Sequence, residues 1–139
     1  MSSIDRPVVG VATVVVKDGS ILIGEDARKG DAVYGVPGGH WESGETLKEC
    51  ATREVKEESG VVCGNVTLIS VYDFYREDKR RSYVTIGMKA DYESGILTDL
   101  QEEGRLNWDW YTPQDALRLK LFPADRILIE RYLSGTVFE

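Results

Sequence analysis

The sequence lacks the features that mark several large classes of protein. It has only two cysteines, Cys50 and Cys63, and one histidine in 139 residues, which excludes a disulfide framework and a zinc site built on histidines. Its longest apolar run, residues 8–16, is shorter than the ~18 residues that a membrane-spanning helix needs. Its amino terminus has no apolar segment typical of a secretory signal. These absences predict a cytoplasmic protein that does not bind membranes.

Basic side chains are also in the minority. The chain has 17 lysines and arginines against 24 aspartates and glutamates, which gives a net charge of −7. Proteins that bind duplex DNA or anionic membrane surfaces need clustered Lys and Arg to meet fixed phosphates. The composition therefore argues against a nucleic-acid polymer as a partner. The same acidity is at odds with a polyanionic substrate, which the motifs below nevertheless indicate.

Length and apolar content predict one globular domain over residues 1–139. Hydrophobic residues make up 42% of the chain and charged residues 29%, and no linker or internal repeat divides it. β-Branched and alternating patterns predict strands at 8–16, 20–24, 33–36, 65–74, 82–92 and 108–111. Helical spacing predicts helices at 46–59 and 123–133, with a helical turn opening at Thr112. The mixture predicts an α/β fold built in layers.

Residues 46–59 have the pattern of a helix with an unusual distribution of charge. The segment begins with the spacing of a capping box and ends before Gly60, where a helix would stop. On a helical wheel of about 100° per residue, its apolar residues form one stripe. Glu54, Glu57 and Glu58 fall on the side of that stripe. Three carboxylates are therefore predicted to converge on the side of the helix that should be buried.

The cost of these charges depends on their exposure. On an exposed face, like charges at helical spacing cost only a few tenths of a kcal/mol, or roughly 0.2–0.5 per pair. On a partly buried face, desolvation costs several kcal/mol per ion unless something compensates. A divalent cation would compensate, and a set of oxygen ligands suits Mg²⁺ or Mn²⁺ rather than Zn²⁺. The wheel alone leaves a metal site and a solvated acidic patch as equal alternatives.

Glycines are concentrated just before this helix. Gly35, Gly38, Gly39 and Gly44 lie within ten residues of one another. Glycine lets a backbone approach phosphate oxygens closely and turn its N–H groups toward them, and a glycine-rich loop that leads into a helix amino terminus is a general anion site. Taken alone, such a loop is more often a simple turn. Beside three carboxylates, it favours a site for a metal ion and a phosphate chain.

Together these residues resemble a known motif, the Nudix box. The motif has nine defined positions over 23 residues, 39–61, and the chain matches all of them. The matching residues, in order, are Gly39, Glu45, Arg53, Glu54, Val55, Glu57, Glu58, Gly60 and Val61. On this resemblance the chain is identified as a member of the Nudix hydrolase superfamily.

The resemblance implies a fold and a chemistry. The fold is the Nudix fold, a mixed β-sheet sandwiched between helices (α/β/α), and the reaction is hydrolysis of a nucleoside diphosphate linked to another group, X. The implied metal ligands are Glu54, Glu57 and Glu58, with Mg²⁺ as the cofactor or Mn²⁺ in its place. The general base would be Glu57 or Glu58, or a residue of a later loop. Glu103 is the candidate there, although a solvated loop acid is the stronger interpretation of it.

The other box residues receive supporting roles by the same resemblance. Arg53 would orient the Glu side chains and act with them in catalysis, and Glu45 would support the geometry of loop and helix. The residues expected to bind the substrate are Gly38, Gly39, His40 and Trp41. For His40, a hydrogen bond within the loop is an equally good interpretation.

Outside the box the chain resembles the MutT-type nucleoside triphosphate pyrophosphohydrolases. The resemblance extends over about residues 8–130 and is carried by segments 37–42, 83–89 and 108–110. It predicts hydrolysis of a nucleoside triphosphate or a modified nucleotide to a monophosphate and pyrophosphate. Trp41 and Ser43 depart from that group, so the base pocket is expected to differ. Arg76 stands where ADP-ribose hydrolases often have a proline, which disfavours ADP-ribose.

Two other functions remain open at this point. One is an ADP-ribose or nucleotide-sugar hydrolase, and the other is a non-catalytic nucleotide sensor on the same fold. The resemblance also implies a homodimer. A bound base should stack on an aromatic ring, although a place in the core is the stronger interpretation of each candidate. The candidates are Tyr34, Trp41, Phe74, Tyr83 and Trp108.

Overall fold

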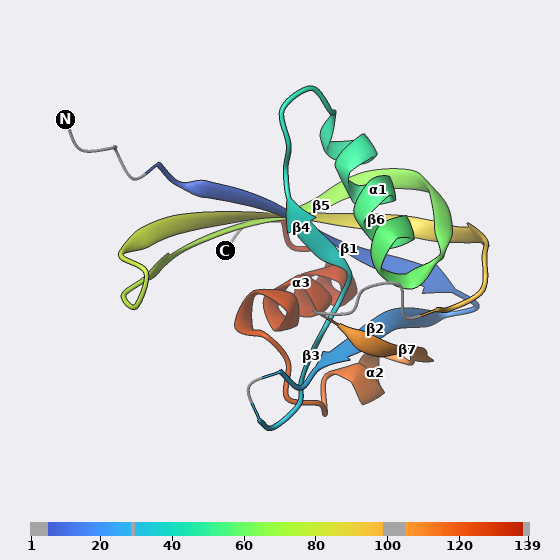
Figure 1. The fold of residues 1–139 in the computed structure, drawn as a ribbon. Helices are drawn as coiled ribbons and strands as arrows, with labels where there is room; N and C mark the ends of the chain where they lie inside the picture. Colours follow the sequence, from blue (N-terminus) through green and yellow to red (C-terminus); the bar gives the residue numbers. More distant parts are fainter. Residues whose placement is uncertain (1–5, 29, 99–104, 138–139) are drawn as a thin grey trace.

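A computed structural model describes residues 6–28, 30–98 and 105–137 of the chain. In these residues one mixed sheet of seven strands lies between helices (Figure 1). The strands are β1 (Val8–Lys17), β2 (Ser20–Asp26), β3 (Val33–Gly35), β4 (Gly38–His40), β5 (Val62–Arg76), β6 (Arg81–Ser94) and β7 (Leu106–Tyr111). The helices are α1 (Leu47–Ser59), α2 (Pro113–Ala116) and α3 (Pro123–Ser134). The predicted layering of a mixed sheet between helices (α/β/α) is confirmed.

The sheet has the order β3-β2-β1-β6-β5, with β4 paired to β1 and β7 paired to β2. The central β1–β6 pair is parallel, and the other strand pairs are antiparallel. β5 and β6 form a long hairpin that extends past the body of the molecule (Figure 1). No helix in the described ranges is long and apolar enough to span a membrane.

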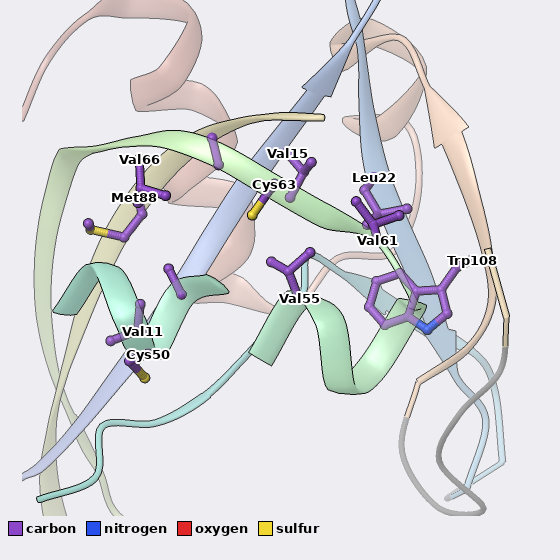
Figure 2. Close-up of a cluster of buried hydrophobic side chains, with 12 residues drawn as sticks. Val11, Val15, Leu22, Cys50, Val55, Val61, Cys63, Val66, Met88 and Trp108 are labelled. Atoms are coloured by element: carbon purple, nitrogen blue, oxygen red, sulfur yellow. The ribbon is translucent and has the colours of Figure 1, made fainter. Parts of the chain in front are cut away.

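The alternation of side chains along β1 explains why its sequence is a continuous apolar run. Val11 and Val15 point to one face of the sheet, where α1 packs with Cys50 and Val55 (Figure 2). Val14, between them in the sequence, points to the opposite face. There α3 packs, through side chains that include Leu128 and Ile129. A strand covered on both faces needs apolar residues at successive positions.

Helix α1 begins and ends where the sequence indicates. The Thr46 hydroxyl accepts a hydrogen bond from the Glu49 N–H, and the Glu49 carboxylate accepts one from the Thr46 N–H. This reciprocal capping box satisfies two backbone donors at the start of the helix. Gly60 ends the helix with a φ of 85°, in the left-handed region that favours glycine.

Strand β4 was not predicted, since residues 38–40 read as part of a loop. Glycine has a low strand propensity and no side chain to show a pattern, but the missing side chains let this segment lie against β1. A Cβ atom at Gly38 would be 2.7 Å from the Val11 carbonyl oxygen. β5 also begins earlier than predicted, at Val62 rather than residue 65.

Candidate active site

Arg53 is the centre of a hydrogen-bond network on α1. Its Nε and Nη2 atoms donate to the two oxygens of Glu45 at 2.9 and 2.8 Å. Its Nη1 donates to Glu54 at 2.5 Å and to Glu57 at 3.2 Å. Its Nη2 also reaches the carbonyl oxygen of His40 at 3.3 Å. One guanidinium therefore links three carboxylates of the box to the glycine-rich segment.

Glu45 orders the loop that leads into α1. The hydrogen bonds from Arg53 are the main reason that the pKa of Glu45 is lowered to about 2. Its carboxylate also accepts the Glu42 N–H at 3.0 Å. Its carbonyl oxygen accepts the indole N–H of Trp41 at 2.9 Å. Glu45 therefore remains ionised at neutral pH and holds the loop to the helix.

Glu54 and Glu58 form the partly buried part of the acidic cluster. The Glu54 side chain is 12% exposed, and its carboxylate lies so close to Gly39 that a Cβ there would overlap it. Glu58 accepts the Gly38 N–H at 3.1 Å. Burial raises the pKa of Glu58 to about 8, and the neighbouring Glu54 charge acts in the same direction. The two carboxylates thus lie side by side against the Gly38–Gly39 backbone.

Glu57 corrects one expectation from the helical wheel. Its side chain is 52% exposed and points toward Arg53 rather than into the buried face. The reason is its place at the margin of the apolar stripe, since the sheet covers only about 100° or somewhat more of a helix circumference. Two of the three carboxylates are therefore shielded from water, and the third lies at the rim.

The carboxylates fit a hard divalent cation whose remaining ligands come from water and substrate. In the part of the chain that the structure describes, no group of three or more Asp, Glu, His or Cys side chains is arranged to hold a metal ion. Mg²⁺, however, usually binds through one or two carboxylates and takes its remaining ligands from water and substrate phosphates. Glu54 and Glu58 are such a pair, and a cation between them would offset two like charges that burial makes costly.

The remaining predicted site residues lie around this cluster. His40 is exposed, and its carbonyl oxygen accepts hydrogen bonds from Arg53 and from the Cys50 thiol. Trp41 is 46% exposed and is held by its bond to Glu45. Glu103 lies outside the described residues.

An aromatic pocket of about 570 Å³ lies between the β5–β6 hairpin and the start of α3. Its lining includes Tyr72, Phe74, Tyr83, Arg105, Phe122 and Asp125. The Tyr72 and Phe74 rings stack with their centroids 5.5 Å apart, and the Phe74 and Tyr83 rings with theirs 5.4 Å apart. This wall offers a flat apolar surface on which a heterocycle could stack.

The structure separates the aromatic candidates of the sequence into three groups. Phe74 and Tyr83 line it and belong to neither core cluster, so the expectation that they are core residues is wrong. They lie on the β5–β6 hairpin, where they face the start of α3 across the pocket. Trp108 is 6% exposed and Tyr34 packs against the core, as expected. Trp41 is 46% exposed, so the expectation that it is a core residue is also wrong.

One short backbone segment joins the aromatic pocket to the acidic cluster. The Val36 N–H donates to Asp125 Oδ2 at 3.2 Å, and two residues later the Gly38 N–H donates to Glu58. Arg105 forms an ion pair with Asp125 at 3.4 Å, and its positive charge acts against the rise that burial causes in the pKa of Glu58 and of Asp125. The pocket and the carboxylates of α1 are therefore both bonded to one backbone segment, at positions two residues apart.

The sequence did not predict three residues of the aromatic pocket. Arg105, Phe122 and Asp125 are far from the box in the chain and follow no local motif. The only local signal is the Phe122-Pro123 step, where the proline marks the first turn of α3. Only the packing of α3 on the sheet brings these side chains beside the box.

Comparisons with known proteins agree with this architecture. The NUDIX domain model matches residues 5–132. The NAD-capped RNA hydrolase NudC of Shigella dysenteriae is 32% identical over 128 residues, which are 91% of this chain and 46% of that protein. The chain thus spans less than half the length of this curated relative.

Solved structures show the same fold. A NUDIX hydrolase from Nitrosomonas europaea superposes with a TM-score of 0.82 at 23% identity, over 96% of this chain and 93% of that one. A MutT NUDIX hydrolase from Burkholderia pseudomallei has a TM-score of 0.80 at 28% identity, over 91% and 98%. The NUDIX domain of Shewanella oneidensis NrtR, solved with ADP ribose, has a TM-score of 0.78 at 19% identity, over 94% and 89%.

The fold, the box and the family match together define the class of this protein. The chain belongs to the Nudix superfamily, and its fold is MutT-like. Nudix hydrolases in general act on pyrophosphate bonds and use a divalent metal ion. The resemblance drawn from the box is confirmed at this level.

Proposed function

We propose that this protein hydrolyses a nucleoside triphosphate, or a closely related modified nucleotide, to a monophosphate and pyrophosphate. The observation that carries the proposal is the junction at residues 36–38, which joins the acidic cluster of α1 to the aromatic pocket. A phosphate chain at the carboxylates and a base between the rings would then be parts of one molecule. Phosphoryl transfer asks a protein mainly for such positioning and for charge stabilisation.

Each box residue has a role in this proposal. Glu54, Glu57 and Glu58 would hold Mg²⁺, or Mn²⁺ in its place. When bound, the metal ion neutralises charge on the phosphates and lowers the pKa of the attacking water. Arg53 positions these carboxylates by donating directly to Glu54 and Glu57. Glu57 or Glu58 would accept the proton of the water, as a general base within reach of it.

The glycine-rich segment would hold the phosphates. The missing side chains of Gly38 and Gly39 let β1 and the Glu54 carboxylate pack against this backbone, so a metal ion held by the carboxylates would bring the phosphates close to it. His40 and Trp41 follow them at the exposed rim, where they would contact the part of the substrate that leaves the cluster. Substrate binding by these four residues is part of the proposal.

A substrate panel tests the reaction. The protein is incubated with the common nucleoside triphosphates, modified deoxynucleotides, ADP-ribose and sugar nucleotides, each with Mg²⁺, with Mn²⁺ and with EDTA, and the products are identified. We expect a monophosphate and pyrophosphate from at least one triphosphate, and no turnover in EDTA. If ADP-ribose is cleaved with a far higher kcat/KM than every triphosphate, the proposal is wrong.

The same panel separates the other candidates. Preferential cleavage of ADP-ribose or a sugar nucleotide would indicate that kind of hydrolase. An RNA with an NAD cap belongs in the panel because the relative NudC is named for that substrate. We expect no cleavage of this RNA, since a chain of net charge −7 has few basic side chains to bind a nucleic-acid polymer. Binding without turnover of any nucleotide would indicate a sensor.

We also propose a homodimer in the cytoplasm. The dimer is inferred from the resemblance to the Nudix family. The cytoplasm is inferred from the scarcity of cysteine, which fits a reducing compartment. Light scattering of the purified protein measures the first, and fractionation of cells measures the second.

A further inference from the structure

Ser59 is a fully buried polar residue at the end of the box helix, and the function proposed above gives it no role. Its hydroxyl donates to the Val55 carbonyl oxygen at 2.8 Å and accepts the Val61 N–H at 3.3 Å. Its own carbonyl oxygen accepts the Thr98 N–H at 2.9 Å. Ser59 is therefore bonded back into α1, forward along the chain, and across to a segment that follows β6.

The segment that supplies the last of these bonds, residues 95–98, is itself held in place. The Tyr92 hydroxyl donates to the Gly95 carbonyl oxygen at 2.8 Å. Leu97 packs against the core cluster on the α1 side of the sheet. A Cβ atom at Gly95 would overlap the Gly60 carbonyl oxygen, so the two backbones are in contact. The 95–98 segment therefore packs directly on the turn that ends α1.

The last turn of a helix is the part that frays most readily, because its final carbonyl groups have no partner within the helix. In α1 the Thr98 N–H supplies a partner for the last of them, the carbonyl of Ser59. Glu58 lies in this turn, directly before Ser59, and its carboxylate accepts the Gly38 N–H at 3.1 Å. If the turn frayed, it would carry the Glu58 carboxylate away from Gly38.

Glu58 differs from the other carboxylates of the cluster in how it is held. Arg53 donates to Glu54 and to Glu57, and so fixes both through their side chains. None of the hydrogen bonds of Arg53 goes to Glu58. The position of the Glu58 carboxylate therefore depends more on the backbone of the turn that Ser59 fixes.

We propose that Ser59 is a positioning residue, which ties the last turn of α1 to the 95–98 segment and so holds Glu58 where it can bind the metal ion. The proposal rests on the proposed function and deepens it, since the Nudix box leaves position 59 undefined. A displacement of about 1 Å at a catalytic group can lower a rate by ~10²-fold. Loosening this turn should therefore weaken metal binding and turnover although every box residue is still present.

Two variants loosen the turn in different ways. Ser59→Ala removes the hydroxyl and both of its hydrogen bonds, and Thr98→Pro removes the N–H that reaches the Ser59 carbonyl oxygen. With Mg²⁺ and the best triphosphate of the panel, we expect kcat to fall roughly tenfold in each, while KM for the nucleotide stays within about twofold. The Mg²⁺ concentration that gives half the maximal rate should rise in both.

Two controls separate positioning from stability. Thr98→Val keeps the N–H and the branched side chain, so it should keep the wild-type kcat. Ile129→Val removes one methyl group from the core on the other face of the sheet, so it should lower Tm but not the kcat measured well below Tm. If Ser59→Ala and Thr98→Pro lower Tm and leave kcat unchanged, Ser59 serves stability alone and the proposal is wrong. A loss of kcat in either control as large as in Ser59→Ala also overturns it.

Metal binding tests the proposal without the proposed reaction. Electron paramagnetic resonance measures the binding of Mn²⁺ to the protein in the absence of nucleotide. We expect Ser59→Ala and Thr98→Pro to raise the Kd for Mn²⁺ roughly tenfold, as the loss of groups that orient metal ligands does, and Thr98→Val to match the wild type. If the wild type binds Mn²⁺ but hydrolyses no nucleotide, the proposed function fails, and this comparison still decides the role of Ser59. Equal Kd values in the wild type and both variants, or no binding of Mn²⁺ by the wild type, contradict the proposal.

Discussion

At the residue scale, the site depends on how the fold divides four carboxylates between water and the interior. Glu54 and Glu58 are shielded beside Gly38 and Gly39, whereas Glu57 lies at the rim. Glu45 is held apart from Glu54 and Glu58 by its two hydrogen bonds from Arg53. Neutralising Glu57 or Glu58 should therefore affect turnover, whereas neutralising Glu45 should affect stability.

Glu57→Gln and Glu58→Gln test the proposed metal and base roles. Each change keeps the volume of the side chain and removes the charge, so we expect kcat to fall by ~10²-fold or more, the range for loss of general acid–base catalysis. Steady-state kinetics with Mg²⁺ measures the loss. Glu130→Gln, an exposed change on α3, is the matched control and should keep the wild-type kcat. Unchanged turnover in Glu57→Gln would remove that residue from the assignment.

The lowered pKa of Glu45 predicts that the stability of the folded protein depends on pH. Its pKa is lowered to about 2, chiefly by the hydrogen bonds from Arg53. A carboxyl with a lower pKa in the folded state stabilises it above the unfolded pKa, and this contribution is lost as the pH falls through the folded value. We expect wild type to melt at a higher Tm than Glu45→Gln at pH 7, with the difference vanishing as the pH approaches 2. Calorimetry from pH 7 to about pH 2 measures both Tm values. A difference in Tm that stays constant over this range would contradict the prediction.

At the scale of the element, α1 holds the proposed catalytic side chains at their register because both of its ends are defined. Thr46 and Glu49 form the capping box, and Gly60 ends the helix in a left-handed conformation. The sequence predicted this element within a residue at each end, since its caps and its spacing are local properties. It could not predict β4, whose glycines carry no local signal and which exists only because β1 lies beside it.

Thr46→Ala tests the contribution of the cap. Removing the hydroxyl leaves the Glu49 N–H without its acceptor, so the free energy of unfolding should fall by about 1 kcal/mol. Thr52→Ala is the matched control. Thr52 lies inside the same helix and donates back to the Lys48 carbonyl, so its replacement by alanine should be neutral or slightly stabilising. Urea unfolding of both variants distinguishes a loss at the cap from a general effect of threonine removal.

At the scale of the whole molecule, the sheet is stable only because helices cover both of its faces. α3 covers the face opposite α1, and Leu128 is buried against Gly87 and Ser70 of the sheet. The same helix carries Asp125 into the aromatic pocket. The packing of α3 therefore supports the core and the site together.

Leu128→Ala should lower the free energy of unfolding by about 2–5 kcal/mol, because it leaves a cavity in a closely packed layer. Leu133→Ala removes the same atoms from an exposed position of α3, where the side chain is 46% exposed. Its effect should stay within about 0.5 kcal/mol. Denaturant unfolding compares the two, and equal losses would mean that α3 does not cover the second face as described.

The sequence by itself determined the α/β class, the helix of the box, most strands and the acidic cluster. Each of these follows from spacing, capping and composition, which are properties of neighbouring residues. The tertiary structure alone decided that Glu57 lies at the rim, that residues 38–40 form a strand, and that Arg105 and Asp125 meet in an aromatic pocket. These depend on contacts between segments far apart in the chain, and no local pattern records such contacts.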